Sequence, residues 1–253
     1  MKTISLAWIL GVLPLIAQAA APMAEIQAGS YRPLYLQKDT PMTFVDAFRM
    51  DKKPVTNREF YQFIMKNPQW SKTKIAIEFS EKQYLQHWIK QGSGYAPKAA
   101  DLDKPVVNVS WFPANQYCQA QGKRLPSTDQ WEYVARASEN AIDGSKSKQY
   151  TQVILDWYAK SAQKPLGKVG QNKPNYWGVY DLHGLIWEWT EDFNNAQLQS
   201  DNPDEGMFCG AGASASTDPN NYAAFIRYGL RSSLQAKFSM PTLGFRCVSN
   251  KPK

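Results

Sequence analysis

The stretch from Tyr176 to Phe193 constrains the fold of this chain more than any other, because it combines bulky rings with two turn-forming glycines. It holds three of the nine tryptophans of the 253-residue chain, and a carboxylate stands at each end of a short turn. Asp181 and Glu188 flank Gly184. A chain reversal at the glycine would therefore bring both carboxylates to one point.

The oxygen atoms around this turn predict a cation site. Two carboxylates and the carbonyl groups between them would converge, and calcium prefers carboxylate and main-chain oxygen ligands. The alternative is structural: Asp181 begins a turn, Glu188 faces solvent and the tryptophans pack in a core. On this stretch alone the structural interpretation is the commoner one for so short a motif.

Residues 1–21 predict a cleaved secretory signal peptide. Lys2 provides a positive start, an apolar run extends from Ile4 to Ile16, and Ala17-Gln18-Ala19 offers the small residues of a cleavage site. The run is too short to span a bilayer, and no later segment approaches a membrane span in length. We therefore expect a secreted or periplasmic protein that does not span the membrane, with one domain over residues 22–253.

The net charge of +7 limits the kinds of partner that the sequence indicates. The lysines are spread along the chain, and no arginine-rich run or nucleic-acid motif accompanies them. We therefore expect a solvated basic surface and no nucleic acid as a partner. A mild attraction to anionic partners is the most that this charge supports.

The chain has three cysteines, and this number limits the disulfides that it can form. In an oxidising compartment an odd number suggests one disulfide and one thiol left over. A leftover thiol is most often a small buried residue, and a redox or intermolecular role is the alternative.

Capping patterns and alternation predict an irregular α+β domain. Ser/Thr-x-x-Glu/Gln boxes begin helices after Thr56 and Ser127, and Ser110 precedes a helix that Gly122 ends. Strands are expected at 23–35, 43–50, 105–110, 208–213, 225–232 and 243–248, a helix at 81–91, and polar loops at 139–170 and 194–206. Without a regular strand–helix–strand alternation, these elements indicate a single α+β domain.

The small number of histidines excludes several kinds of site. Only His87 and His183 are present, so a three-histidine zinc site cannot form. No nucleophile elbow, P-loop or dinucleotide glycine motif occurs, which leaves standard hydrolase and nucleotide chemistry unsupported. His183 lies in the central turn, where a polar surface or pocket role is the default and catalysis is the alternative.

Five strings in chain order resemble one family. They are Val55-Thr-Asn-Arg-Glu-Phe60; Pro105-Val-Val-Asn-Val-Ser-Trp111 with Tyr117-Cys118; Gly122-Lys-Arg-Leu-Pro-Ser127 with Trp131-Glu-Tyr133; Gly178-Val-Tyr-Asp with Gly184 and Trp187-Glu-Trp189; and Arg227, Arg231 and Gly244-Phe-Arg-Cys247. Together they resemble the formylglycine-generating enzyme (sulfatase-modifying factor) family. The resemblance covers most of the chain after residue 21 and implies a variant of the C-type lectin fold.

The resemblance implies a disulfide and a ligand set for calcium. Family members join the two cysteines that correspond to Cys118 and Cys247, which would leave Cys209 free. The calcium site of the central turn corresponds to the side chains of Asp181 and Glu188 and the carbonyls of Gly184 and Ile186. Leu185 stands where the family usually has asparagine, so the hydrogen bonds of the turn are expected to differ.

The resemblance breaks at the copper site. The oxidases of the family bind copper(I) through two cysteines five residues apart, because a soft metal suits thiolates. Aligning the chain on Arg227 and Arg231 places Ala223 and Tyr228 at those positions, and neither can supply a thiolate. Cys209 lies fourteen residues before Ala223. Copper binding and formylglycine generation are therefore not expected.

These observations predict an exported family member that keeps the scaffold without the copper dithiolate. The resemblance implies a groove formed by Trp187, Arg227, Tyr228, Arg231, Arg246 and His183. Its functional interpretation is binding of a peptide or small anionic ligand, in support of the maturation of an exported protein. One alternative is a divergent oxidative enzyme that modifies a secreted peptide or siderophore-type precursor. The structural alternative is that the arginines bridge loops and the tryptophans fill the core.

Overall fold

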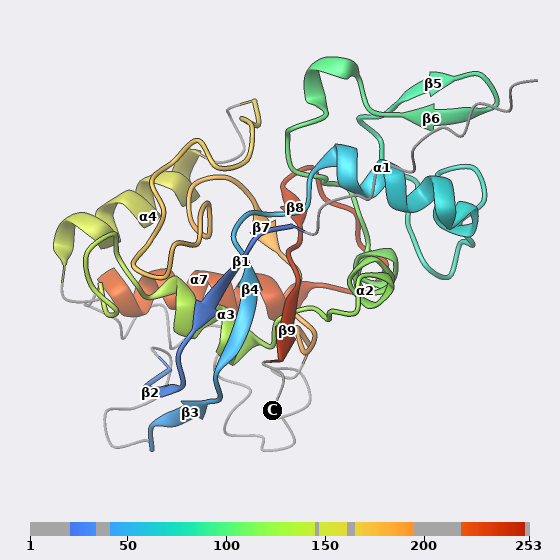
Figure 1. Cartoon of the computed structure of the whole chain (residues 1–253). Helices are drawn as coiled ribbons and strands as arrows, with labels where there is room; N and C mark the ends of the chain where they lie inside the picture. Colours follow the sequence, from blue (N-terminus) through green and yellow to red (C-terminus); the bar gives the residue numbers. More distant parts are fainter. Residues whose placement is uncertain (1–20, 34–40, 145–146, 161–164, 195–218, 251–253) are drawn as a thin grey trace, which may run out of the picture.

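The structure is a computed structural model that describes residues 21–33, 41–144, 147–160, 165–194 and 219–250. The strands are β1 (Met23–Ile26), β2 (Gly29–Tyr31), β3 (Thr43–Val45), β4 (Phe48–Asp51), β5 (Ile89–Gln91), β6 (Gly94–Ala96), β7 (Trp187–Glu188), β8 (Leu243–Gly244) and β9 (Val248–Asn250). The helices are α1 (Asn57–Lys66), α2 (Trp111–Ala120), α3 (Thr128–Ala135), α4 (Lys148–Lys160) and α7 (Pro219–Ser233), with short 3-10 turns at Pro68–Trp70 and Ala99–Asp101. Figure 1 shows this irregular mixture of short strands and helices, which confirms the predicted α+β class.

A three-stranded antiparallel sheet in the order β1–β4–β9 brings together the first and last described strands. Met23 of β1 pairs with Asp51 of β4. Ile26 and Met50 are fully buried on this sheet, since alternate side chains of a strand point to the same face. Helix α3 contributes Trp131 to the same apolar cluster, so α3 and the sheet share one core.

The helix predicted after Thr56 is confirmed as α1. The Thr56 side chain accepts a hydrogen bond from the Glu59 N–H, and the Glu59 carboxylate accepts one from the Thr56 N–H at 2.8 Å. Phe60, Phe63 and Ile64 are buried at the three- and four-residue spacing of a helix face. They join buried residues of α2 in a second core cluster.

The other two predicted helix starts are also observed. Ser127 and Gln130 form a second capping box at α3. Ser110 precedes α2, but its hydroxyl donates to the Phe79 carbonyl at 2.6 Å and makes no cap bond. Gly122 follows α2 with a φ of +66°, a conformation that favours glycine.

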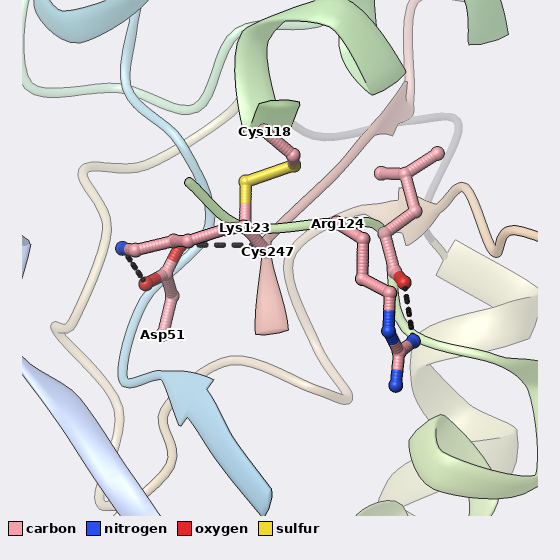
Figure 2. Close-up of a disulfide and its surroundings, with 6 residues drawn as sticks. Asp51, Cys118, Lys123, Arg124 and Cys247 are labelled. Carbon is pink, nitrogen blue, oxygen red and sulfur yellow. Dashed lines mark hydrogen bonds and ion pairs between the residues drawn. A yellow bond between two sulfur atoms is a disulfide. The ribbon is translucent and has the colours of Figure 1, made fainter. Parts of the chain in front are cut away.

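Cys118 of α2 and Cys247, just before β9, form a disulfide, as the family resemblance implied (Figure 2). The two cysteines are 129 residues apart, and a loop of this size contributes about 4–5 kcal/mol in the chain-entropy model. Beside the disulfide, the Asp51 carboxylate accepts from Lys123 Nζ at 2.6 Å and from the Cys247 N–H at 3.1 Å. Burial raises the pKa of Asp51, and the neighbouring ammonium group opposes that rise. The end of β4 is therefore held to the segment that follows α2 and to the residue that precedes β9.

The strand predicted over 225–232 is wrong, because these residues belong to α7. Ala223, Arg227 and Arg231 are buried at intervals of four residues. Four is an even number and also close to one helical turn, so this spacing places side chains on one face of either element. Burial of the neighbouring Ala224 as well fits the helix and not the strand.

Four other expectations are corrected. The predicted helix at 81–91 is a series of turns, with Leu85 at a φ of +47°, and it ends in β5. The predicted strand at 105–110 is interrupted by Asn108, which has a φ of +51° and donates its N–H to Met240. The polar region 139–170 contains the helix α4. The run 243–248 forms β8 and then the start of β9 rather than one strand.

Some expectations fall on other parts of the chain. Other residues lie outside the described part of the chain: 1–20 of the signal peptide predicted at 1–21, 195–206 of the loop predicted at 194–206, the strand predicted at 208–213, and Cys209. Within the described residues, no helix has both the length and the apolar character needed to cross a membrane.

Candidate functional site

The central turn is built on main-chain conformations that few residues adopt. Gly178 and Gly184 have φ values of +76° and +101°, and Asp181 has +59°. After the turn, β7 pairs in parallel with β8, which places Glu188 opposite Gly244. A Cβ atom on Gly244 would overlap the Val106 carbonyl oxygen, so this close approach of two chains requires glycine.

Glu188 and Arg246 form a fully buried ion pair beneath this turn. Arg246 Nε lies 2.8 Å from Glu188 Oε2, and Nη2 lies 2.7 Å from Oε1, with both side chains 0% exposed. Trp131 Nε1 donates to Glu188 Oε2 at 2.8 Å. The remaining guanidinium hydrogens reach the carbonyls of Asp51, Lys52 and Tyr180. The structure thus places Arg246 inside the core rather than in an open groove.

Both carboxylates of the predicted calcium site already have hydrogen-bond partners in this structure. Both Asp181 oxygens accept hydrogen bonds, one from the Gly170 N–H and one from Asn172 Nδ2 at 2.9 Å. The Glu188 oxygens are held by Arg246 and Trp131. A guanidinium group already supplies the positive charge beside Glu188, and like charge would repel a calcium ion there. The predicted donor set therefore does not fit calcium in this arrangement.

A second buried cluster joins one carboxylate to two guanidinium groups. Glu132 of α3 accepts from Arg227 Nη2 at 2.6 Å, from Arg227 Nε at 2.9 Å, and from Arg231 Nη1 at 2.6 Å. The two arginines are four residues apart on α7, so both reach the same carboxylate. Their guanidinium groups lie over the ring of Trp131, at 5.8 Å for Arg227 and 4.8 Å for Arg231.

The electrostatics of this cluster leave an excess positive charge. Burial alone would raise the pKa of Glu132, but Arg227 and then Arg231 outweigh it and lower the pKa to about 2. The carboxylate is therefore ionised at neutral pH. Two guanidinium groups and one carboxylate carry a net charge of +1 inside the protein.

Three aromatic rings stack beside the cluster. Trp187 of β7 lies 4.8 Å from Tyr158 with nearly parallel rings, and 5.0 Å from Trp157. All three side chains are half-buried. Arg227 Nη1 donates to the Tyr158 hydroxyl at 2.9 Å, which joins the stack to the charged cluster. We call Trp157, Tyr158 and Trp187 the aromatic stack.

The structure therefore brings together three of the six predicted groove residues, Trp187, Arg227 and Arg231. Tyr228 follows Arg227 on α7, and consecutive helical side chains point about 100° apart. Trp157 and Tyr158 were not predicted, because region 139–170 was expected to be a loop. Their spacing from Tyr150 and Ile154 follows the four- and seven-residue intervals of a helix face, which is the signal that indicates α4.

His183 also contacts Trp131. Its Nε2 donates to the Ala135 carbonyl at 2.9 Å, because a carbonyl oxygen can only accept. Its ring packs edge-on against Trp131 and Tyr150. Burial, followed by the charge of Arg227, lowers the pKa of His183 to about 3. The imidazole is therefore neutral at physiological pH.

Comparison with known proteins places this geometry in a family context. A model of the sulfatase-modifying factor enzyme 1-like domain matches residues 17–251. The inactive C-alpha-formylglycine-generating enzyme 2 of Bos taurus is 29% identical over 249 residues, covering 81% of this chain and 78% of the relative. The formylglycine-generating enzyme of Bos taurus is 26% identical over 248 residues, covering 81% and 66%. The crystal structure of CarF shares the fold, with a TM-score of 0.54, 15% identity and coverage of 92% of this chain and 99% of CarF.

Proposed function

The chain belongs to the sulfatase-modifying factor enzyme 1-like family, and from that premise we propose that it is an exported member without copper-dependent oxidase activity. In this proposal it binds a peptide or small anionic ligand between α7 and the aromatic stack. Binding there assists the maturation of another exported protein.

The observation that carries the loss of oxidase activity is the disulfide. The chain has three cysteines, and Cys118 and Cys247 are bonded to each other. One cysteine, Cys209, is left, whereas a copper(I) dithiolate needs two thiolates. The disulfide also agrees with an oxidising compartment, which supports export.

The conformation of α7 adds a second argument. Ala223 and Tyr228 occupy the positions that correspond to the family's paired cysteines, and both lie on this helix. Side chains five residues apart on an α-helix point about 140° away from each other. Two residues so placed would not converge on one metal ion.

The binding function rests on the charge and shape of the surface beside α7. Among the described residues, Glu132 is the one carboxylate paired with Arg227 and Arg231, so an anion would balance the remaining positive charge. The aromatic stack next to it is half-buried, so part of its apolar surface is open to solvent. A flat ligand or side chain with a negative group fits both features.

The first experiment tests the loss of oxidase activity. The mature protein is titrated with copper(I) without oxygen, then incubated aerobically with a cysteine-containing peptide. A formylglycine-generating enzyme serves as the positive control. We expect no tight one-to-one copper uptake and no aldehyde by mass spectrometry. Stoichiometric uptake with aldehyde formation would overturn the proposal. Copper-independent oxygen consumption with a secreted peptide or siderophore-type precursor would favour the oxidative alternative.

The second experiment tests anion binding by calorimetric titration with benzoate and with an acidic peptide. Arg231→Gln removes the excess charge and leaves the Arg227–Glu132 pair intact, so this variant is expected to fold. It should weaken benzoate binding about tenfold. Arg58→Gln, which removes an exposed arginine paired with Asp103, is the matched control and should bind normally. Equal loss in both variants would show that only general surface charge is involved.

A further inference from the structure

A cavity of about 670 Å³ lies between the first half of α4 and segments 137–140, 172–175 and 179–184. Its volume is within the usual range for small-molecule sites. The aromatic stack and the two arginines of α7 do not line it. It is therefore separate from the proposed anion site.

The walls of the cavity divide into an apolar interior and a polar rim. Ile154, Val179 and Leu182 line it and are buried. At the rim, Glu139 and Lys173 form an exposed ion pair with an Nζ–Oε2 distance of 3.2 Å. A ligand that enters the apolar interior needs an apolar body, because burial of apolar surface on both sides favours binding.

Asp181 places an uncompensated negative charge in the cavity wall. Asp181 is one of the residues that line the cavity, and it is 4% exposed. It accepts hydrogen bonds from the Gly170 N–H and from Asn172, but has no ion-pair partner among the described residues. Buried carboxylates are normally paired. Because a carboxylate has about four acceptor positions, about two stay open here.

The other charged groups near the cavity form no ion pair with Asp181 among the described residues. The Lys53 ammonium group lies beside Gly170 and over the Tyr180 ring, but it is not paired with the Asp181 carboxylate. Glu139 and Lys173 compensate each other at the rim. His183 lines the cavity in its neutral form, with Nε2 committed to Ala135. Arg227 and Arg231 are bound to Glu132 and pack on Trp131. The lining therefore carries a net charge of −1.

We propose that this cavity binds a small organic ligand with a primary ammonium group on an apolar body. The ammonium group donates to the open positions of Asp181, and the apolar body lies against Ile154, Val179 and Leu182. A metal ion suits the cavity less well, because calcium needs six or more oxygen ligands and the apolar wall supplies none.

Benzylamine and benzyl alcohol are the probes, because they have the same ring and chain length and differ in charge. Each is titrated, in buffer with EDTA, into protein labelled with ¹⁵N and ¹³C in histidine. The chain has two histidines, so His183 reports on the cavity and His87, which does not line it, is the internal control. Benzylamine should shift the His183 signals saturably and bind at least about tenfold more tightly than the alcohol.

Two variants make the test specific. Asp181→Asn should fold, because asparagine tolerates the positive φ and its oxygen can still accept from Gly170. It should abolish the preference for benzylamine. Asp103→Asn makes the same change on the surface and should leave the preference intact. Val153→Trp, at the exposed rim of the cavity, should weaken both probes.

Three results would overturn the proposal. They are equal affinity for the amine and the alcohol, a preference that survives Asp181→Asn, and benzylamine shifts at His87 instead of His183. Because the probes and variants leave α7 untouched, failure here would not bear on the proposed anion site.

Discussion

Two buried arginine–carboxylate clusters meet at Trp131, and they differ in charge balance. The indole N–H of Trp131 donates to Glu188, which is paired with one arginine. The face of the same ring carries the two arginines that share Glu132. The first cluster is neutral and fully enclosed, whereas the second has an excess charge of +1 and lies beside half-buried aromatic rings.

This difference separates a structural role from the binding role that we propose. Arg246 donates its remaining hydrogen bonds to main-chain carbonyls at the end of β4 and in the central turn. It therefore joins segments of the fold, and its positive charge is balanced by Glu188. Among the described residues the α7 arginines share one carboxylate, and the anion that we propose would balance the remaining positive charge. An arginine predicted to lie in a groove therefore indicates anion binding only if its charge is not already balanced by a carboxylate.

The largest expected effect comes from breaking the neutral cluster. Arg246→Met leaves Glu188 buried without a counter-charge, which should lower the free energy of unfolding by about 3–5 kcal/mol. Urea denaturation measures it. The double variant Arg246→Met with Glu188→Leu removes both charges and should recover part of the loss. A single-variant loss below about 1 kcal/mol would contradict the structural role of this pair.

A smaller loss is expected in the charged cluster. Glu132→Gln leaves two guanidinium groups without a carboxylate and should destabilise the protein by about 2–4 kcal/mol. Added benzoate should then raise the melting temperature of this variant more than that of the wild type, because an anion replaces the missing charge. If benzoate has the same effect on both, this cluster is as closed to ligands as the first.

The next prediction concerns the pH dependence of stability that the two histidines cause. Burial lowers the pKa of His183 to about 3 and that of His87 to about 4. Below pH 6.5 the unfolded chain binds protons that these buried rings do not, so stability is complete above about pH 6.5 and falls as the pH drops towards the folded pKa values. At pH 5 the loss is roughly 2 kcal/mol for each histidine.

The matched variant for this prediction is His183→Gln, whose side-chain N–H can still donate to Ala135. Its stability should fall about half as steeply between pH 6.5 and 5 as that of the wild type in urea titrations. Glu132 does not contribute in this window. Its lowered pKa supports stability above about pH 4.5, and that support is lost only as the pH falls towards 2. An unchanged slope in the variant would mean that His183 is not buried.

The smallest expected effect concerns calcium. The Arg246 guanidinium group is paired with the Glu188 carboxylate. The melting temperature of the wild type should therefore be the same in calcium as in EDTA. A rise that disappears in Asp181→Ala would show that Glu188 exchanges its arginine for a metal ion. The calcium site implied by the family resemblance would then be present, and the neutral cluster would not be permanent.

Local sequence patterns predicted the helix starts well and α7 poorly. Capping boxes at Thr56 and Ser127 involve side chains three residues from their partners, so they form wherever the chain turns into a helix. The four-residue spacing of Arg227 and Arg231 fits both a helix and a strand, and the choice depends on what α7 packs against. The aromatic residues of α4 carried a helical period within a region of polar composition.

The sequence by itself determined the number of thiols and histidines, the helix caps and, through resemblance, the disulfide. These are counts or short-range patterns, or they depend on strings that a family shares. Only the tertiary structure decided which arginine meets which carboxylate, since Glu188 and Arg246 are 58 residues apart and Glu132 and Arg227 are 95 apart. Charge balance in a core depends on contacts between distant segments, and no local pattern encodes it.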